Sequence, residues 1–161
     1  MFQTSLPPES EQSLYRSLAE FRHQLRLFLA ASEEAAHKAG LQPQQHQLLL
    51  ALAGAPAEQV ASIGFAAERL GLKHNTVVEL VDRSEAEGLL RRRDDPQDRR
   101  RVRLEVTAHG RKVLSRLSQV HLQELGSRAP HLIDALQNVL RPDAVRSKLP
   151  EHSKAVAGPA R

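Results

Sequence analysis

Cysteine and tryptophan are absent from the sequence, and aromatic residues of any kind are rare. None of the 161 residues is Cys or Trp, and aromatic residues make up 3% of the chain. A chain without cysteine has no disulfide, no thiolate nucleophile, no thiol redox switch and no zinc–cysteine site. The shortage of aromatic rings also argues against modules that stack unpaired bases, as many single-strand and RNA-binding proteins do.

Long apolar runs are absent as well. No segment approaches the ~18 consecutive apolar residues that a membrane-spanning helix needs. The first residues read MFQTSLPPESEQ and lack the basic and apolar regions of a secretory signal. A length of 161 residues with 40% hydrophobic residues fits one compact domain. We therefore expect a cytoplasmic protein that does not contact the membrane.

Patterns typical of catalysis and metal binding are also missing. The sequence has no glycine-rich phosphate loop and no Ser-His-Asp context, and the pair Asp94-Asp95 lies in an arginine-rich segment. The eight histidines are scattered, with no two of them four residues apart on one predicted helix. We therefore predict a protein that is not an enzyme and that needs neither a metal nor a cofactor.

Positive charge is concentrated in one short segment. The chain has a formal net charge of +4, from 23 Lys and Arg against 19 Asp and Glu. Residues 91–103 contain seven Arg and three Asp and carry the same net charge, so the rest of the chain sums to zero. The planar fork of arginine suits phosphate and groove contacts. A charge run is more often a solvated surface, and its place in a hairpin here favours the nucleic-acid interpretation.

Apolar spacing predicts long helices near both ends of the chain. Leucine and phenylalanine side chains recur at steps of three and four residues from Leu14 to Phe28, which predicts a helix from about Glu11 to His37. Its narrow apolar face either packs against its own domain or forms a dimer interface. A second long helix follows Thr107 as its N-cap, and a further helix is predicted to open at Pro130.

The middle of the chain predicts a helix-turn-helix. Pro43 opens a helix that ends near Gly54, and two helices around a tight turn are predicted between Gly64 and Gly88. A helix-turn-helix needs a small residue in its first helix and a glycine four positions later for the tight turn. It also needs two apolar residues, three positions apart, on the inner face of its second helix. These residues are Ala67, Gly71, Val77 and Leu80.

Local signals leave two points open. The piece Ala61–Ile63 is either a short strand or the entry to the next helix, with Ser62 as its cap. Asn75 or Thr76 is predicted to cap the second helix of the motif, within the usual boundary error.

A β-hairpin follows the helix-turn-helix directly. Val102, Leu104 and Val106 alternate with charged residues at period two, which predicts a half-buried strand. The run Leu89–Arg93 precedes an Asp-Pro turn and is predicted to pair with that strand. The predicted fold class is therefore mainly α with a small β-hairpin wing (α+β), a winged helix-turn-helix.

Four strings of residues carry a resemblance to a known family. They are Gly40-Leu41-Gln42-Pro43 with Gln45 and the leucines after it, Ala67-Glu68-Arg69-Leu70-Gly71-Leu72, Val81-Asp82-Arg83 with Gly88-Leu89, and Asp95-Pro96-Gln97-Asp98-Arg99-Arg100 with Val106-Thr107 and Gly110. In this order they resemble the MarR family of dimeric winged-helix transcription regulators over about residues 14–140. Ser84 stands where the family usually has leucine, so either its hydroxyl bonds a backbone carbonyl or the helix packs less tightly there.

The resemblance implies a division of the chain. The expected parts are a flexible arm (1–12), a MarR-like domain (13–140) with a winged-helix core (about 41–107) and dimerisation helices (about 13–38 and 108–140), and a flexible tail (141–161).

The resemblance also implies how the chain meets DNA. The helix from about His74 would lie in the major groove, and Arg100 would enter the minor groove with Asp98 orienting its guanidinium. The residues implied in DNA contact are His74, Asn75, Thr76, Val78, Arg83, Asp98, Arg99, Arg100 and Arg101.

Partners follow from the same resemblance. It implies a homodimer on a pseudo-palindromic double-stranded operator, commonly a repressor that a small-molecule effector releases. Phe28, His37 and His46 are the candidate ligand-binding residues, although each also fits an ordinary core or surface role. A winged-helix scaffold and a non-specific architectural DNA binder are the alternatives.

Overall fold

The computed structural model describes residues 8–96, 98 and 101–140. The wing arginines Arg99 and Arg100, the first seven residues and the tail from residue 141 lie outside the described residues.

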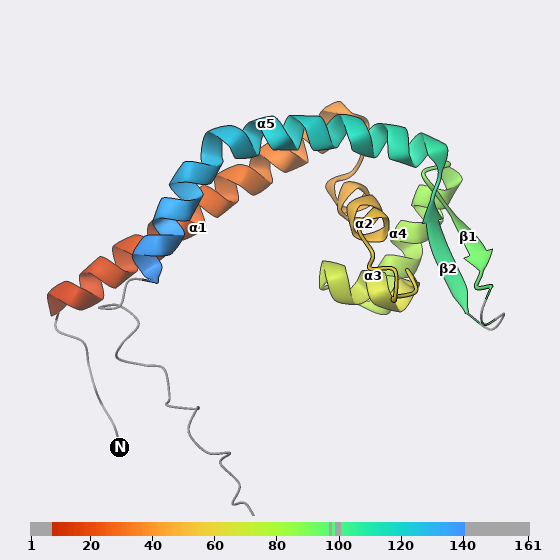
Figure 1. The fold of residues 1–161 in the computed structure, drawn as a ribbon, viewed down its shortest axis with the longest axis horizontal. Coiled ribbons are helices and arrows are strands. Elements are labelled where there is room, and N and C mark those ends of the chain that lie inside the picture. The colour runs from red at the N-terminus through yellow and green to blue at the C-terminus, as the bar shows by residue number, and fades with distance from the viewer. Residues whose placement is uncertain (1–7, 97, 99–100, 141–161) are drawn as a thin grey trace, which may run out of the picture. The chain divides into compact units, whose positions relative to one another are not determined.

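Five helices and one antiparallel hairpin form the described chain, one helix fewer than the sequence predicts (Figure 1). In chain order the elements are α1 (Pro8–Lys38), α2 (Pro43–Ala53), α3 (Ile63–Leu70), α4 (His74–Ala86), β1 (Leu90–Asp94), β2 (Val102–Val106) and α5 (Ala108–Val139). The chain divides into two compact units, one of residues 28–126 and one of residues 1–27 with 127–161.

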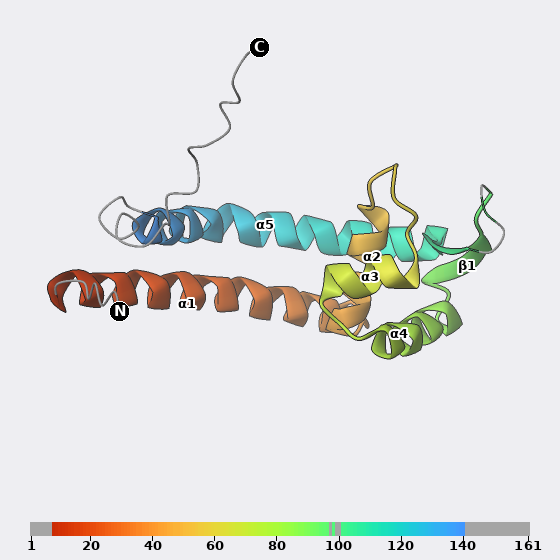
Figure 2. The same cartoon turned by 90° about the horizontal axis from the view of Figure 1, so that it is seen from below.

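The hydrophobic core of the larger unit joins the three short helices to the hairpin and to the adjoining parts of the long helices. The most completely buried large side chains include Leu48 and Leu49 of α2, Leu80 of α4 and Leu90 of β1. Burial of each such side chain stabilises the fold by about 1.5–3 kcal/mol. Figure 2 shows α2, α3 and α4 gathered next to the hairpin.

The helix-turn-helix has the geometry that its spacing predicts. The Ser62 hydroxyl accepts the N–H of Phe65 at 3.2 Å and caps α3. Gly71 ends α3 with φ +64°, a left-handed conformation that favours glycine. Val77 and Leu80 of α4 are 0% and 1% exposed, so they fix the inner face of this helix.

In this region one of the two alternatives for Ala61–Ile63, the strand, is wrong, and so is the predicted cap of α4. Ala61–Ile63 forms no strand, because α3 already begins at Ile63. A single backbone hydrogen bond joins this segment to β2, from the N–H of Leu104 to the Ala61 carbonyl at 2.7 Å. Asn75 and Thr76 do not cap α4. The N-cap is Lys73, which makes no side-chain capping bond, because the turn after Gly71 is short and α4 starts at His74.

The hairpin places alternate residues on opposite faces. Leu90 pairs with Val106 and Arg92 with Leu104, in an antiparallel register. Leu90, Leu104 and Val106 are buried. The arginines between them therefore lie at or near the surface of the sheet.

Helix α5 is fastened to the hairpin at its first turn. The Thr107 hydroxyl accepts the N–H of Gly110 at 3.0 Å and donates to the carbonyl of Gly88 at 2.6 Å, so Thr107 is the predicted cap. Pro130 does not open a new helix, and that prediction is wrong. It lies inside α5, which runs on to Val139 although a proline removes its own N–H from the helical ladder and crowds the carbonyl four residues before it.

The smaller unit has very little core of its own. Of residues 11–27 and 127–140, Ala135 alone is buried. Large apolar side chains on both helices are instead exposed. They are Tyr15, Leu18 and Leu25 of α1, Ile133 and Leu136 of α5, and Leu140 directly after α5.

Candidate nucleic-acid interface

Helix α4 has a fixed inner face and a free outer face. Val77, Leu80, Val81 and Ser84 are buried on the inner face. His74, Asn75 and Arg83 are exposed, whereas Thr76 and Val78 are half-buried. Because Asn75 is not a cap, its amide forms no hydrogen bond within the described part of the chain. The first turn of α4 therefore offers polar groups that are not used by the fold.

Ser84 occupies its inward position by satisfying its hydroxyl internally. The side chain is 0% exposed, and Oγ donates to the carbonyl of Leu80 at 2.8 Å. Of the two alternatives that the sequence leaves open, bonding to a backbone carbonyl is the correct one. Glu79 is exposed on the same helix, where it adds a negative charge near the predicted DNA face.

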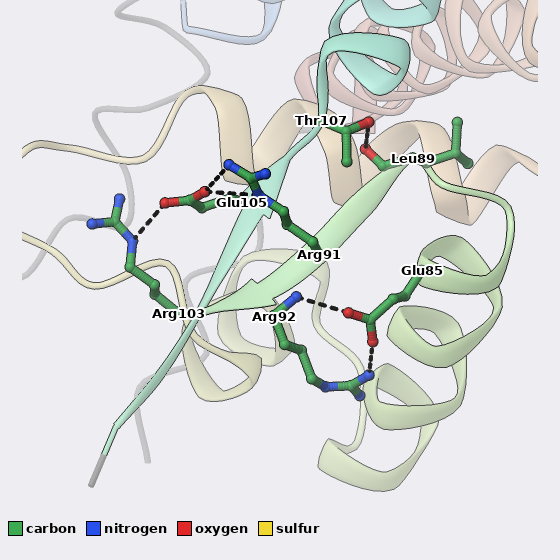
Figure 3. A network of polar contacts seen from close by, with 7 residues as sticks. All are labelled: Glu85, Leu89, Arg91, Arg92, Arg103, Glu105 and Thr107. Carbon is green, nitrogen blue, oxygen red and sulfur yellow. Dashed lines mark hydrogen bonds and ion pairs between the residues drawn. The ribbon is translucent and has the colours of Figure 1, made fainter. Parts of the chain in front are cut away.

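Arg92 links the wing to α4. Its guanidinium contacts the Glu85 carboxylate, and its backbone N–H donates to Glu85 Oε1 at 2.8 Å (Figure 3). The guanidinium also lies 2.6 Å from Asp82 Oδ1. Strand β1 is thus joined to the last two turns of α4 by three polar contacts.

The pKa values of this cluster follow from those contacts. The backbone N–H of Arg92 is the largest cause that holds the pKa of Glu85 below its usual value. Burial and the Asp82 charge oppose this lowering, and the Arg92 guanidinium adds to it. Burial alone would lower the pKa of Arg92, and the carboxylates of Asp82 and Glu85 outweigh it and raise that pKa. Because the pKa of Glu85 is lowered by folding, its stabilisation is present at neutral pH and is lost as the pH falls through the folded-state pKa.

On the other face of the hairpin, Glu105 pairs with two arginines. Glu105 Oε2 lies 3.0 Å from Arg91 Nη2, and Oε1 lies 3.6 Å from Arg103 Nε (Figure 3). The charge pattern of the sequence does not by itself indicate these ion pairs or those of Arg92. The register of the hairpin was the available signal, since it places Arg91 directly opposite Glu105.

The ion pairs change the distribution of positive charge that the sequence suggests. Arg91, Arg92 and Arg103 on the arms of the hairpin are each matched by a carboxylate of this chain. Arg93 and Arg101 are exposed and form no ion pair among the described residues. The free cationic groups of the described wing therefore lie toward its tip. Asp98, predicted to orient Arg100, is exposed beside this tip.

Two neighbouring arginines of β1 supply a matched pair of substitutions. We expect Arg92→Met to lower the free energy of unfolding by about 1–2 kcal/mol, because it leaves two carboxylates of α4 without their partner. Arg91→Met removes the same charge from the more exposed ion pair and should change stability by less than about 0.5 kcal/mol. Urea unfolding at pH 7 measures both. Equal losses in the two variants would show that Arg92 does not fasten the wing.

The predicted ligand residues divide into two groups. Phe28 and His46 line a cavity of about 760 Å³ with residues of α2, α3 and α5, whereas His37 is exposed and lies outside it. His46 is 3% exposed, and its ring centroid is 4.7 Å from that of His121. Burial, together with the nearby His121, lowers the pKa of His46 to about 4, so the ring is neutral at pH 7.

Neither a metal cluster nor a membrane helix is found in the described ranges. Within residues 8–96, 98 and 101–140, no three His, Asp or Glu side chains are grouped to hold a metal ion. No helix of the described chain is long and apolar enough to cross a bilayer.

Comparison with known proteins relates this architecture to the MarR family. Residues 39–101 match the model of the MarR family. AbsC, a MarR family transcriptional regulator from Streptomyces coelicolor, is 21% identical over 89% of this chain and 97% of its own, with a TM-score of 0.62. CouR from Rhodococcus jostii RHA1, solved with p-coumaroyl-CoA, is 24% identical over 77% of this chain and 88% of its own, with a TM-score of 0.59.

A third solved structure contains DNA. A mutant of MepR from S. aureus, bound to an oligodeoxyribonucleotide, is 17% identical over 78% of this chain and 91% of its own, with a TM-score of 0.57. No curated protein sequence matches the chain. The match to the MarR family at residues 39–101 contains the helix-turn-helix and the first arm of the wing. The chain also has the fold of solved MarR family transcription regulators. The resemblance to the MarR family that the sequence indicates is therefore confirmed.

Proposed function

We propose that this chain is a sequence-specific double-stranded DNA-binding transcription regulator. It acts as a homodimer on a pseudo-palindromic operator, as a repressor that a small-molecule ligand releases. The observation that carries the proposal is the free outer face of α4 beside a wing whose unpaired arginines lie toward its tip. The MarR family match supports DNA binding and transcription regulation as the general function.

In this proposal α4 reads the major groove. Asn75 and Thr76 donate to or accept from base edges, and Val78 contacts a thymine methyl group. Arg83, exposed two turns after Asn75, contacts a phosphate together with His74 at the start of the helix. The buried inner face keeps these residues at fixed positions, which a sequence-specific contact requires.

The wing reads the adjacent minor groove. Arg100 enters the groove, Asp98 orients it, and Arg99 and Arg101 contact the flanking phosphates. Because the arms are internally paired, they position the tip and add little to phosphate neutralisation. We therefore expect a dimer to neutralise about six phosphates, with a slope of roughly −5 in log K against log[salt].

The homodimer is supported by the smaller unit. This unit exposes more large apolar side chains than a solvent-facing surface normally does. They are Tyr15, Leu18, Leu25, Ile133 and Leu136. A second copy would bury them and would hold the two winged helices at the spacing of one operator.

Ligand release is supported by the cavity that Phe28 and His46 line. It has the volume of a typical small-molecule site, and its walls come from both long helices and from α2 and α3. CouR, which shares the fold, is solved with a bound small molecule. A ligand that fits only one arrangement of these helices would shift the dimer away from its DNA-binding arrangement.

The internally paired arms favour a second candidate function. Because Arg91, Arg92 and Arg103 are matched by carboxylates, the wing is less cationic than its sequence suggests. A winged-helix scaffold or an architectural DNA binder without sequence preference needs no unpaired tip arginines and no ligand response.

One experiment separates these functions. Rounds of selection from random duplexes, followed by anisotropy titrations at 50 and 200 mM salt, should enrich an inverted repeat whose binding weakens steeply with salt. Salt-sensitive binding without an enriched sequence would replace the proposal by the architectural one. Absence of binding at 50 mM salt would leave the scaffold as the function.

A further inference from the structure

Helix α4 carries one acidic side chain at the centre of its outer face. Glu79 is exposed, and it lies in one row along the helix with Asn75 before it and Arg83 after it, each four residues away. Val77 and Val81, each two residues from Glu79, are both 0% exposed. Because residues two positions apart on a helix face nearly opposite directions, Glu79 points directly away from the core.

The fold uses the other acidic side chains of α4 and of its C-cap. Asp82 and Glu85 both contact the guanidinium of Arg92. Glu87, the C-cap, accepts a hydrogen bond at 2.9 Å from a side-chain amide of α2. Glu79 forms no ion pair and no hydrogen bond within the part of the chain that the structure describes, although a basic residue follows it at a suitable spacing. Its carboxylate therefore stabilises nothing in the fold and is available to a partner.

A carboxylate at this place limits the base pairs that α4 accepts. In the proposed function, on which this inference rests, α4 lies in the major groove between two rows of phosphates. An ionised carboxylate only accepts hydrogen bonds, so the phosphates and the acceptor atoms of guanine and thymine repel it. Cytosine presents a donor, the N4–H, and no acceptor on its major-groove edge, whereas adenine presents an acceptor beside its donor. Cytosine is therefore the base that best satisfies this side chain.

We propose that Glu79 is the specificity-determining residue of α4, and that its carboxylate accepts the N4–H of one cytosine in each operator half-site. On duplexes without this cytosine the carboxylate meets phosphate charge and base acceptors without a donor, which weakens binding. Glu79 thus selects the operator largely by rejecting other sequences. Arg83, exposed one turn later, contacts a phosphate and offsets the repulsion at the correct site.

Two substitutions separate the charge of Glu79 from its hydrogen bond. Glu79→Gln keeps the shape of the side chain but offers both a donor and an acceptor, so the preferred base should change from cytosine to adenine. Glu79→Ala removes the contact and the charge. It should show no preference at this one position and should bind non-specific duplex more tightly than the unaltered chain, by about twofold or more.

Parallel selections from random duplexes test this assignment. The unaltered full chain, Glu79→Gln and Glu79→Ala are used at the same salt concentration, and the enriched half-sites are compared position by position. The unaltered chain should enrich a C·G pair at one position where the two variants do not. Replacing that pair should weaken binding of the unaltered chain by about tenfold and binding of Glu79→Ala by less than about twofold.

A modified base tests the hydrogen bond itself. N4-methylcytosine keeps its Watson–Crick pair with guanine but has a methyl group in place of the N–H in the major groove. The unaltered chain should bind an operator with this base about tenfold more weakly, whereas Glu79→Ala should bind both operators alike. Glu33→Gln is the matched control, because it neutralises an exposed carboxylate of α1 and should enrich the same half-site as the unaltered chain. Circular dichroism melting confirms that each variant is folded.

Three results would overturn the role of Glu79 and leave the proposed function standing. One is enrichment of the same half-site by the unaltered chain and both variants. Another is a preference that depends on Glu79 but falls on a base other than cytosine. The third is an enriched cytosine whose N4-methylation does not weaken binding. If the unaltered chain and the variants enrich no sequence at all, the role of Glu79 and the proposed function are overturned together.

Discussion

Gly110→Ala should lower the free energy of unfolding by about 3 kcal/mol or more. Gly110 lies in the first turn of α5, where an added Cβ would overlap the carbonyl oxygen of Leu89 and stand 2.9 Å from Val106 Cγ1. That carbonyl cannot move freely, since it accepts the N–H of Thr107 at 3.0 Å. Overpacking of about 1–3 kcal/mol is therefore joined by the loss of a hydrogen bond, worth about 1 kcal/mol.

A second glycine of the same helix is the control. Gly126 has nothing within 4 Å of an added Cβ. Gly126→Ala should therefore stabilise α5 by up to about 1 kcal/mol through helix propensity. Urea unfolding at one fixed protein concentration measures both variants, since association shifts apparent stability. If Gly110→Ala has the same free energy of unfolding as the unaltered protein, Gly110 of α5 does not approach the Leu89 carbonyl as closely as the structure shows.

Arg100→Ala should weaken operator binding by about 30-fold or more while leaving the homodimer intact. Arg100 lies outside the described residues, so the expectation comes from the wing string in the sequence. One minor-groove contact contributes at least about 1 kcal/mol, and a dimer presents two wings. Anisotropy titration on the selected operator measures the loss, and sedimentation reports the dimer.

Two further variants identify the origin of the effect. Arg100→Lys keeps the charge but loses the planar fork, so it should recover only part of the affinity if the groove shape is read. Arg22→Ala removes one exposed charge from α1 and should change affinity by less than twofold. Full recovery with lysine would mean that this position only neutralises phosphate.

Several predictions that rest on chain-local chemistry are confirmed. Gly71 at the turn, Pro43 at the start of α2 and Thr107 at the start of α5 each have a conformational preference that acts within a few residues. The helix-turn-helix and the hairpin could therefore be located from sequence alone. Pro130 shows the limit of this reasoning, because α5 continues through it despite the lost hydrogen bond and the crowding by the proline ring.

Contacts between residues far apart in the sequence could not be predicted from the sequence. His46 and His121 are on different helices, and nothing local to either residue indicates the other. The same holds for Arg92, whose partners Asp82 and Glu85 belong to the preceding helix. The number of arginines in the wing therefore overstates its free positive charge, since several of them are already paired with carboxylates.

The contacts of Arg92 have a consequence for the duplex that this protein would bind. Because its guanidinium and its backbone N–H both hold the end of α4, strand β1 cannot swing away from that helix without breaking them. The distance between a base edge read by α4 and a minor groove read by the wing is then set by the protein. An operator that does not match this distance must bend or change its groove width. Selection should thus favour flexible pyrimidine–purine steps between the two contacts, at base pairs that no side chain touches.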